Sequence, residues 1–307
     1  MATVPAPSGT VAADATKDVA KSRSRTRTKR SGGDQQRTHP LTWVAVFAIM
    51  VFCLFPFYWL INTSLKTGSD LSGADLLPPS ATLNNYDSVL RNGDFLKALR
   101  NSAVVSLTVT LFSLVIGSFC AYAIARLRFP GKYVLLAGIL SVTTFPGIAI
   151  AAPLFKLWTD LNIYNTLIGL MVPYLTFTLP LTIYVLVSFF RDIPKSLEEA
   201  ALVDGATHFQ AFYKIVVPLA APGMATAAIL TFIFAWNEFL LAITLTSSSA
   251  ARTVPASIAF FTGSTQFEQP LGTISAASVI ISIPIIVLVL VFQKRIVAGL
   301  TAGGVKG

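Results

Sequence analysis

Charged residues are scarce in this sequence: only 12% of its 307 residues are Asp, Glu, Lys or Arg, whereas 54% are hydrophobic. Soluble globular domains are about 25% charged, so this chain has too little charge to cover a soluble surface of its size. Its two cysteines, Cys53 and Cys120, both lie in long apolar runs, which argues against a disulfide framework. The composition therefore predicts an all-α polytopic membrane protein.

Histidine is equally scarce, and the two present, His39 and His208, lie outside the long apolar runs. Neither can form an H-E-x-x-H zinc site or a serine–histidine pair inside a membrane, which argues against a metal site or an intramembrane enzyme. The phosphate-binding pattern G-x-x-x-x-G-K-[S/T] is also absent from the sequence. We therefore expect this chain to bind no cofactor and to catalyse no reaction.

Six apolar segments are long enough to cross about 30 Å of hydrocarbon as helices. They contain no Lys or Arg and are expected near Trp43–Ile61, Ala103–Ala125, Tyr133–Phe155, Leu167–Phe190, Pro222–Leu245 and Thr273–Phe292. The residues before them are polar and basic without apolar periodicity, which is typical of disorder. The expected domains are a disordered basic arm at 1–40, a six-helix membrane domain at 41–292 and a short tail at 293–307.

The distribution of basic residues indicates the orientation of these helices, because Lys and Arg concentrate in cytoplasmic connections. With the N-terminus inside, most of the 23 Lys and Arg residues are cytoplasmic, and the outer connections hold Lys66, Arg91, Lys97, Arg100, Lys156 and Arg252. We expect a multi-pass membrane protein with both termini on the cytoplasmic side. The net charge of +9 is interpreted as an orientation signal rather than a nucleic-acid site, with lipid contact by the RSRTRTKR run as an alternative.

The connection between the fourth and fifth segments, residues 191–218, has the pattern of a helical hairpin rather than a span. Ser196 and Glu199 have the spacing of a capping box, and Gly205 permits a tight turn after the first helix. A second helical stretch is expected to be stopped by Pro218. The loop is thus expected to be a short helix–turn–helix on the cytoplasmic face.

Two features of this loop suit docking to another protein. Ala200, Ala201 and Gly205 have almost no side chain, so a partner's backbone could approach closely. An apolar stripe at helical spacing comprises Phe209, Phe212, Ile215 and Val216. The stripe fits packing on a partner and packing on the protein's own helices equally well.

The order Glu199-Ala200-Ala201, three residues, Gly205, nine residues, Ile215, two residues and Pro218 resembles the EAA motif of ABC-importer permeases, with Val217 where many members have Leu. The similarity extends over about residues 47–307. It is carried by IGLMVPYLTFTLPL, SFFRDIPKSLEEA, FIFAWNEFLLA and RIVAGLTAGGVKG, which are similar to the carbohydrate, MalG-like branch. Within that branch, the runs Val216–Ala242 and FTGSTQFEQP are particularly similar to trehalose-importer permeases, although no residue chemistry independently indicates trehalose.

The resemblance implies a location in the bacterial cytoplasmic membrane and the type I ABC-importer permease fold. Residues 191–218 would be a coupling loop seated in a groove of a separate ATPase. Glu199 would be the charged contact, and Gly205 the turn that lets the helix fit. The implied partners are a second permease subunit, two copies of a cytoplasmic ATPase that bind ATP and Mg²⁺, and an extracellular sugar-binding protein or lipoprotein. The tail would insert toward the ATPase pair, and a frayed terminus is the alternative.

Glu238 is the one Asp, Glu, Lys or Arg residue within the six expected spans. A carboxylate at this depth is costly and generally faces protein, water or a ligand. Trp236 and Asn237 precede it, and an aromatic face beside an amide and a carboxylate suits sugar binding. Contact of these three residues with substrate and an interhelical hydrogen bond that fixes packing both remain open.

Four prolines, Pro146, Pro173, Pro180 and Pro284, lie inside expected spans and permit bends that line a cavity. The expected function is half of the translocation pathway for a di- or oligosaccharide, with trehalose or a related α-glucoside such as maltose implied by the resemblance. The alternative is a stand-alone secondary transporter with Glu238 as an ion relay. The sequence shows neither further internal charge pairs nor an inverted repeat that would favour it.

Overall fold

The structure is a computed structural model that describes residues 40–261 and 270–302. All regular elements in these two ranges are helices, which confirms the all-α prediction. The chain divides into two compact units between Leu54 and Phe55, and most of the described residues belong to the second unit. The predicted arm, the FTGSTQFEQP run after Phe261 and the last residues of the predicted tail lie outside the described residues.

Four helices are long and apolar enough to cross a membrane, in agreement with four of the expected spans. Their bounds are Pro40–Ser64 for α2, Gly93–Arg126 for α4, Leu167–Asp192 for α7 and Leu271–Ala302 for α14. Pro173 and Pro180 lie within α7, and Pro284 lies within α14, without ending either helix. The number of candidate spans among the described residues rises to six if each of two bent helix pairs counts as one span.

The first bent pair replaces the expected continuous span Tyr133–Phe155. Helix α5 (Lys132–Ser141) and the 3₁₀ turn η2 (Val142–Thr144) meet α6 (Gly147–Asp160) at 87°. Phe145 is extended (ψ 126°) because the residue before a proline is driven out of the helical region, and Pro146 follows it. The prediction of a continuous span over Tyr133–Phe155 is therefore wrong, whereas the bend expected at Pro146 is confirmed.

The second correction concerns the expected span Pro222–Leu245. Helix α11 covers Ala221–Asn237, and a separate short helix α12 covers Leu240–Leu245. Glu238 between them is extended, with ψ of 124°. No proline lies at this break, so apolar composition alone suggested a continuous helix.

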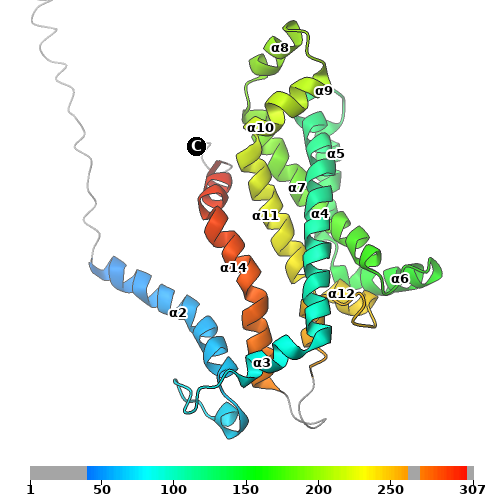
Figure 1. Ribbon diagram of the computed structural model, residues 1–307. Coiled ribbons are helices and arrows are strands. Elements are labelled where there is room, and N and C mark those ends of the chain that lie inside the picture. The colour runs from blue at the N-terminus through cyan, green and yellow to red at the C-terminus, as the bar shows by residue number, and fades with distance from the viewer. Residues whose placement is uncertain (1–39, 262–269, 303–307) are drawn as a thin grey trace, which may run out of the picture. The chain divides into compact units, whose positions relative to one another are not determined.

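Helices α4, α7 and α11 pack against one another and form the centre of the second unit (Figure 1). Between them, the hydroxyls of Ser113 and Thr178 are 2.7 Å apart, and those of Thr182 and Thr231 are 2.9 Å apart. A Cβ on Gly117 would lie 2.7 Å from the methyl group of Thr182, so glycine permits this close crossing. Small residues and hydroxyl pairs of this kind are typical of helix contacts in membranes.

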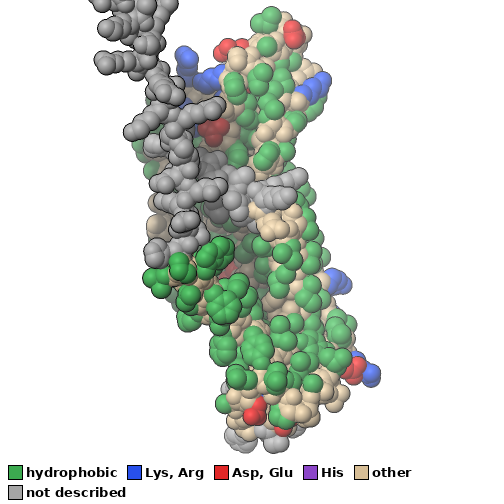
Figure 2. Space-filling view, turned by 90° about the vertical axis from the view of Figure 1, so that its left-hand side faces the viewer, with side chains coloured by type: hydrophobic (Ala, Val, Ile, Leu, Met, Phe, Trp, Pro, Cys, Tyr) green, Lys and Arg blue, Asp and Glu red, His purple; other side chains and the backbone are tan. Residues whose placement is uncertain are grey.

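The second unit has two different ends along these central helices. One end carries α8 (Lys195–Val203) and α9 (His208–Ala211) and is called the loop end here (Figure 1). The other end carries α3 (Asn84–Arg91), α13 (Val254–Ile258) and the short helix α12. Hydrophobic side chains cover the middle of one face, while most charged side chains lie toward its two ends (Figure 2). An apolar middle suits a bilayer, because hydrocarbon cannot hydrate charge.

Candidate functional site

The first helix of the predicted coupling loop is α8, which follows directly on Pro194. The predicted capping box of Ser196 and Glu199 is wrong, because α8 begins at Lys195 and its N-cap, Pro194, makes no side-chain bond. The capping box of the loop lies instead at Thr207 and Gln210. Gln210 N donates to Thr207 Oγ1 over 3.2 Å, and Thr207 N donates to Gln210 Oε1 over 2.8 Å. The T-x-x-Q pattern before α9 was the signal that the sequence interpretation missed.

The second half of the loop is a bent helical path rather than one helix. Helix α9 continues into a π-helical turn, η3 (Phe212–Val216), and then α10 (Val217–Leu219). The helical path ends at Leu219, one residue after the stop expected at Pro218, and turns by 75° before α11. Pro218 stands in the first turn of α10, where the missing N–H is tolerated.

The turn between the two halves depends on Gly205. Its φ is +89°, a left-handed conformation that is costly for residues with a Cβ. Ala206 N donates to Ala201 O over 2.9 Å, and Gly205 N donates to Leu202 O over 3.1 Å, which closes the C-terminus of α8. A Cβ at Gly205 would meet no atom within 4 Å, so the constraint within this chain is conformational rather than steric. The expected tight turn is confirmed.

The residues predicted to contact an ATPase lie on two differently exposed parts of the loop. Glu199, Ala200 and Gly205 are exposed, and Ala201 is half-buried. Pro218 is exposed, whereas Ile215 is half-buried. The residues of the motif on α8 are therefore accessible to a partner protein.

The apolar stripe of the loop packs mainly on the protein's own helices. Val216 is fully buried and Phe212 is 6% exposed, both in a cluster with Ile124 of α4 and Phe190 of α7. Phe209 is the exception, because 60% of it remains exposed. Of the two alternatives left open by the pattern, packing on the chain's own helices holds for the buried members of the stripe.

One loop residue that the sequence interpretation did not single out is Glu198. It is 8% exposed, and its Oε1 lies 2.5 Å from Nε of Arg126, the last residue of α4. Tyr122 donates its hydroxyl hydrogen to the other carboxylate oxygen over 3.0 Å. Arg126 Nη2 also donates to Ile193 O over 2.8 Å. We call Tyr122, Arg126 and Glu198 the α4–α8 cluster.

The second candidate site, around Glu238, is turned toward the protein. Tyr174 of α7 donates to Glu238 Oε2 over 2.6 Å. The backbone N–H groups of Leu241 and Ala242 donate to the same carboxylate over 2.8 and 3.0 Å. The carboxylate therefore caps α12 and ties it to α7, as a charged acceptor at a helix N-terminus does. The buried Tyr174, beside Pro173, was not singled out from the sequence.

The other two residues of the predicted sugar-contact set point elsewhere. Trp236 is 3% exposed and donates its Nε1 hydrogen to Ile281 O of α14 over 3.1 Å. Asn237 is exposed, and its amide donates to Ile233 O within α11 over 2.9 Å. The structure therefore does not bring the three side chains to one surface: Trp236 is buried, Glu238 is half-buried and Asn237 is exposed.

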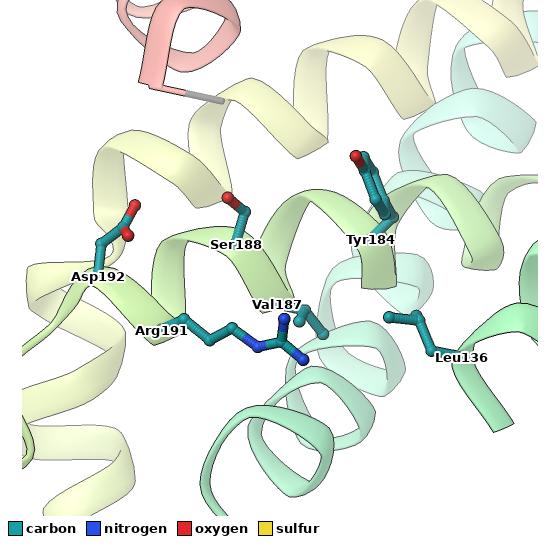
Figure 3. A pocket seen from close by; sticks show the side chains of 6 residues that line it. All are labelled: Leu136, Tyr184, Val187, Ser188, Arg191 and Asp192. Carbon is teal, nitrogen blue, oxygen red and sulfur yellow. The ribbon is translucent and has the colours of Figure 1, made fainter. Parts of the chain in front are cut away.

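A small cavity of about 190 Å³ lies where α5 packs on the last turns of α7. Its lining residues are Leu136, Tyr184, Val187, Ser188, Arg191 and Asp192 (Figure 3). The Arg191 side chain extends toward Val187 and Leu136, while Ser188 and Asp192 point to the other side of α7 (Figure 3). Ligand pockets are usually about 300–1,000 Å³, so this cavity alone is small for a disaccharide.

Most of this chain is similar in sequence to known proteins. Residues 113–301 match the family described as "Binding-protein-dependent transport system inner membrane component". The chain is 50% identical over 266 residues to the trehalose transport system permease protein SugB of Mycobacterium tuberculosis, covering 86% of this chain and 97% of the relative. It is 40% identical to the trehalose/maltose transport system permease protein MalG of Thermococcus litoralis, over 86% and 95% of the two chains.

Other relatives and a solved structure extend these similarities. The sulfoquinovosyl glycerol transport system permease protein SmoH of Agrobacterium fabrum is 42% identical over 87% of this chain and 94% of the relative. A chain in the crystal structure of a bacterial ABC transporter that imports the acidic polysaccharide alginate has a TM-score of 0.70. It is 24% identical and covers 83% of this chain and 94% of that chain, which supports the fold.

Proposed function

This chain belongs to the family of binding-protein-dependent transport system inner membrane components. On this premise, we propose that it is a permease subunit of an ABC sugar importer. It forms half of the translocation pathway and takes its energy from a separate ATPase. The observation that carries the proposal is the 50% identity to a trehalose transport permease over 97% of that relative. The proposed substrate is a di- or oligosaccharide, with trehalose or a related α-glucoside such as maltose as the first candidate.

Coupling to the ATPase occurs through the exposed side of the loop. Glu199 and Ala200 on α8 and the left-handed turn at Gly205 support this role, because all three are exposed at the loop end. The small side chains allow a groove of the partner to close over α8, and Glu199 supplies a charged contact. ATP and Mg²⁺ are bound by the partner, so this chain needs no phosphate site of its own.

The proposed assembly contains a second permease subunit, two copies of the ATPase and an extracellular sugar-binding protein or lipoprotein. Exposed apolar side chains along α4 and α14, such as Leu107, Leu111, Ile286 and Leu290, are available for the second permease and for membrane lipid. Both chain termini and the loop lie on the cytoplasmic side. Sugar-loaded binding protein outside and ATP inside then bias the same equilibrium between inward- and outward-open states.

Uptake of radiolabelled trehalose by cells lacking this chain tests the proposal. We expect uptake to be lost, to return when the chain is supplied, and to fail when the partner ATPase carries an inactivating substitution. Unlabelled maltose and sulfoquinovosyl glycerol, added separately as competitors, define the substrate class. Full uptake in cells without this chain, or full uptake without ATP hydrolysis, would overturn the proposal.

A further inference from the structure

We propose that the α4–α8 cluster is a positioning device that makes the coupling loop and α4 move as one body. The inference rests on the proposed function, since it concerns how a push on the loop reaches the membrane. Glu198 is its central residue, and Arg126 and Tyr122 hold it. None of the three is proposed to touch the ATPase or the sugar.

Two consecutive glutamates on α8 have opposite surroundings. Glu199 is exposed, whereas Glu198 is 8% exposed and faces α4. Consecutive helix residues differ by about 100° around the axis, so one turn of α8 presents a carboxylate to solvent and another to the protein. A buried carboxylate is costly unless it is paired and hydrogen-bonded. Glu198 has both kinds of partner, and both come from α4.

Arg126 holds two consecutive parts of the chain with one guanidinium group. Its Nε lies 2.5 Å from Glu198, and its Nη2 donates to the carbonyl of Ile193 over 2.8 Å. Ile193 lies in the link between the end of α7 and the start of α8. The guanidinium therefore forms an ion pair with the carboxylate on one side and a hydrogen bond with the carbonyl on the other. The link and the helix are therefore both held to the last residue of α4.

Tyr122 connects the cluster to the second half of the loop. It lies one helical turn before Arg126, and its hydroxyl donates to Glu198. Its ring packs on Phe212 of η3 with the ring centroids 4.8 Å apart. One side chain of α4 thus contacts both α8 and η3, the two arms on either side of the turn at Gly205.

This geometry opposes any tilt of the loop relative to α4. A tilt would separate Arg126 from Glu198, whose side chains are only 6% and 10% exposed, and would leave each buried charge without its ionic partner. Helix α4 in turn packs on α7 and α11 along its length. A displacement of α8 by the ATPase is therefore passed to the membrane helices instead of being absorbed at the joint.

The test uses the complete importer, with both permeases, the ATPase and the sugar-loaded binding protein, in proteoliposomes. The number of sugar molecules imported per ATP hydrolysed is measured together with the amount of ATPase retained on purification. For Glu198→Gln, we expect ATPase retention to stay normal and the sugar-to-ATP ratio to fall about tenfold. Tyr122→Phe keeps the ring contact with Phe212 and should lower the ratio less.

The variants are chosen so that folding defects do not decide the result. Tyr122→Phe removes one hydroxyl group only, and Tyr164→Phe, in the link between α6 and α7, is its matched control with an unchanged ratio. The exchanged pair Arg126→Glu with Glu198→Arg should recover part of the ratio lost in either single variant. A role in folding alone would instead lower the amount of assembled importer and leave the ratio unchanged.

The same experiment separates this inference from the proposed function. Glu199→Gln and Gly205→Trp should reduce ATPase retention, because they alter the exposed side of the loop. If these two variants leave retention and uptake normal, the proposed coupling function is wrong. If they impair retention while Glu198→Gln and Tyr122→Phe keep the wild-type sugar-to-ATP ratio, the coupling function stands and the positioning role of the α4–α8 cluster is refuted.

Discussion

Two glutamates turned into the protein, Glu198 at the loop end and Glu238 in the break after α11, have their carboxylates stabilised by different means. Glu198 has a positive partner, Arg126, and a hydroxyl donor, Tyr122. Glu238 has a hydroxyl donor, Tyr174, and two backbone N–H groups of α12, and none of its described partners is charged.

The difference shows that similar carboxylates serve different purposes in this fold. The ion pair of Glu198 joins two separate helices and depends on both charges being present. The contacts of Glu238 include its own chain three and four residues ahead, so its main effect is to end α11 and begin α12. Loss of charge should therefore be severe at the first site and mild at the second.

The largest effect is expected from Arg126→Met, which leaves the buried Glu198 carboxylate without its ion-pair partner. We expect a loss of about 3–5 kcal/mol in the free energy of unfolding. Denaturant unfolding of the purified chain in detergent measures it. The matched control is Arg91→Met, which breaks the exposed ion pair with Asp87 and should change stability little. Equal effects at the two sites would contradict the buried, joining role of the α4–α8 cluster.

A smaller effect is expected at the second glutamate. Glu238→Ala removes the acceptor for Tyr174 and for the start of α12, and should cost about 2 kcal/mol in the same unfolding measurement. Glu238→Gln should cost less, because its amide oxygen can still accept from Tyr174 and from Ala242 N, and only the N–H of Leu241 loses its acceptor. Sugar uptake with Glu238→Gln distinguishes the two roles left open by the sequence. An unchanged KM fits the capping role, and a large rise in KM at normal stability would show substrate contact.

The turn of the loop should respond more weakly still. Gly205→Ala places a Cβ at a left-handed position without any steric contact, so we expect a cost of about 1–2 kcal/mol. Amide hydrogen exchange in α8 and α9 should increase, with little change in α4. Gly205→Asn should be milder, since asparagine tolerates this conformation better. An alanine variant with wild-type exchange would show that the φ of +89° is not needed.

The smallest effect concerns the two candidate capping residues. Thr207→Ala should destabilise α9 by about 1 kcal/mol, because Thr207 accepts from Gln210 N in the observed capping box. Ser196→Ala should have almost no effect, because α8 is capped by Pro194 without a side-chain bond. Hydrogen exchange of the first turns of α8 and α9 measures both. A larger effect at Ser196 would contradict the observed helix start.

The long apolar segments made much of the fold predictable from the sequence. Their length and lack of charge correctly indicated α2, α4, α7 and α14, and Pro146 correctly indicated a bend. The break at Glu238 could not be found by hydropathy, because the residues on both sides are apolar. One of the contacts of Glu238 at this break is a hydrogen bond from Tyr174, which lies 64 positions earlier in the chain.

The helix and turn that are exposed in the loop were also predictable, because the spacing of Glu199 and Gly205 indicated them. The buried position of Glu198 was not, since the sequence places it beside Glu199 and says nothing about which one faces the protein. In the sequence, Arg126 is only a basic residue directly after an expected span. Its role in the α4–α8 cluster requires the three-dimensional contact of α4 with α8.

The most direct measurement of the central claim is sugar import into proteoliposomes that contain the complete importer, with wild-type chain or with Gly205→Trp. We predict that wild-type vesicles accumulate trehalose only with ATP and the partner ATPase, and that Gly205→Trp vesicles fail to accumulate it although the permeases are correctly inserted. Accumulation by this chain without the ATPase, or normal ATP-driven accumulation by Gly205→Trp, would contradict a permease that receives its energy through this loop.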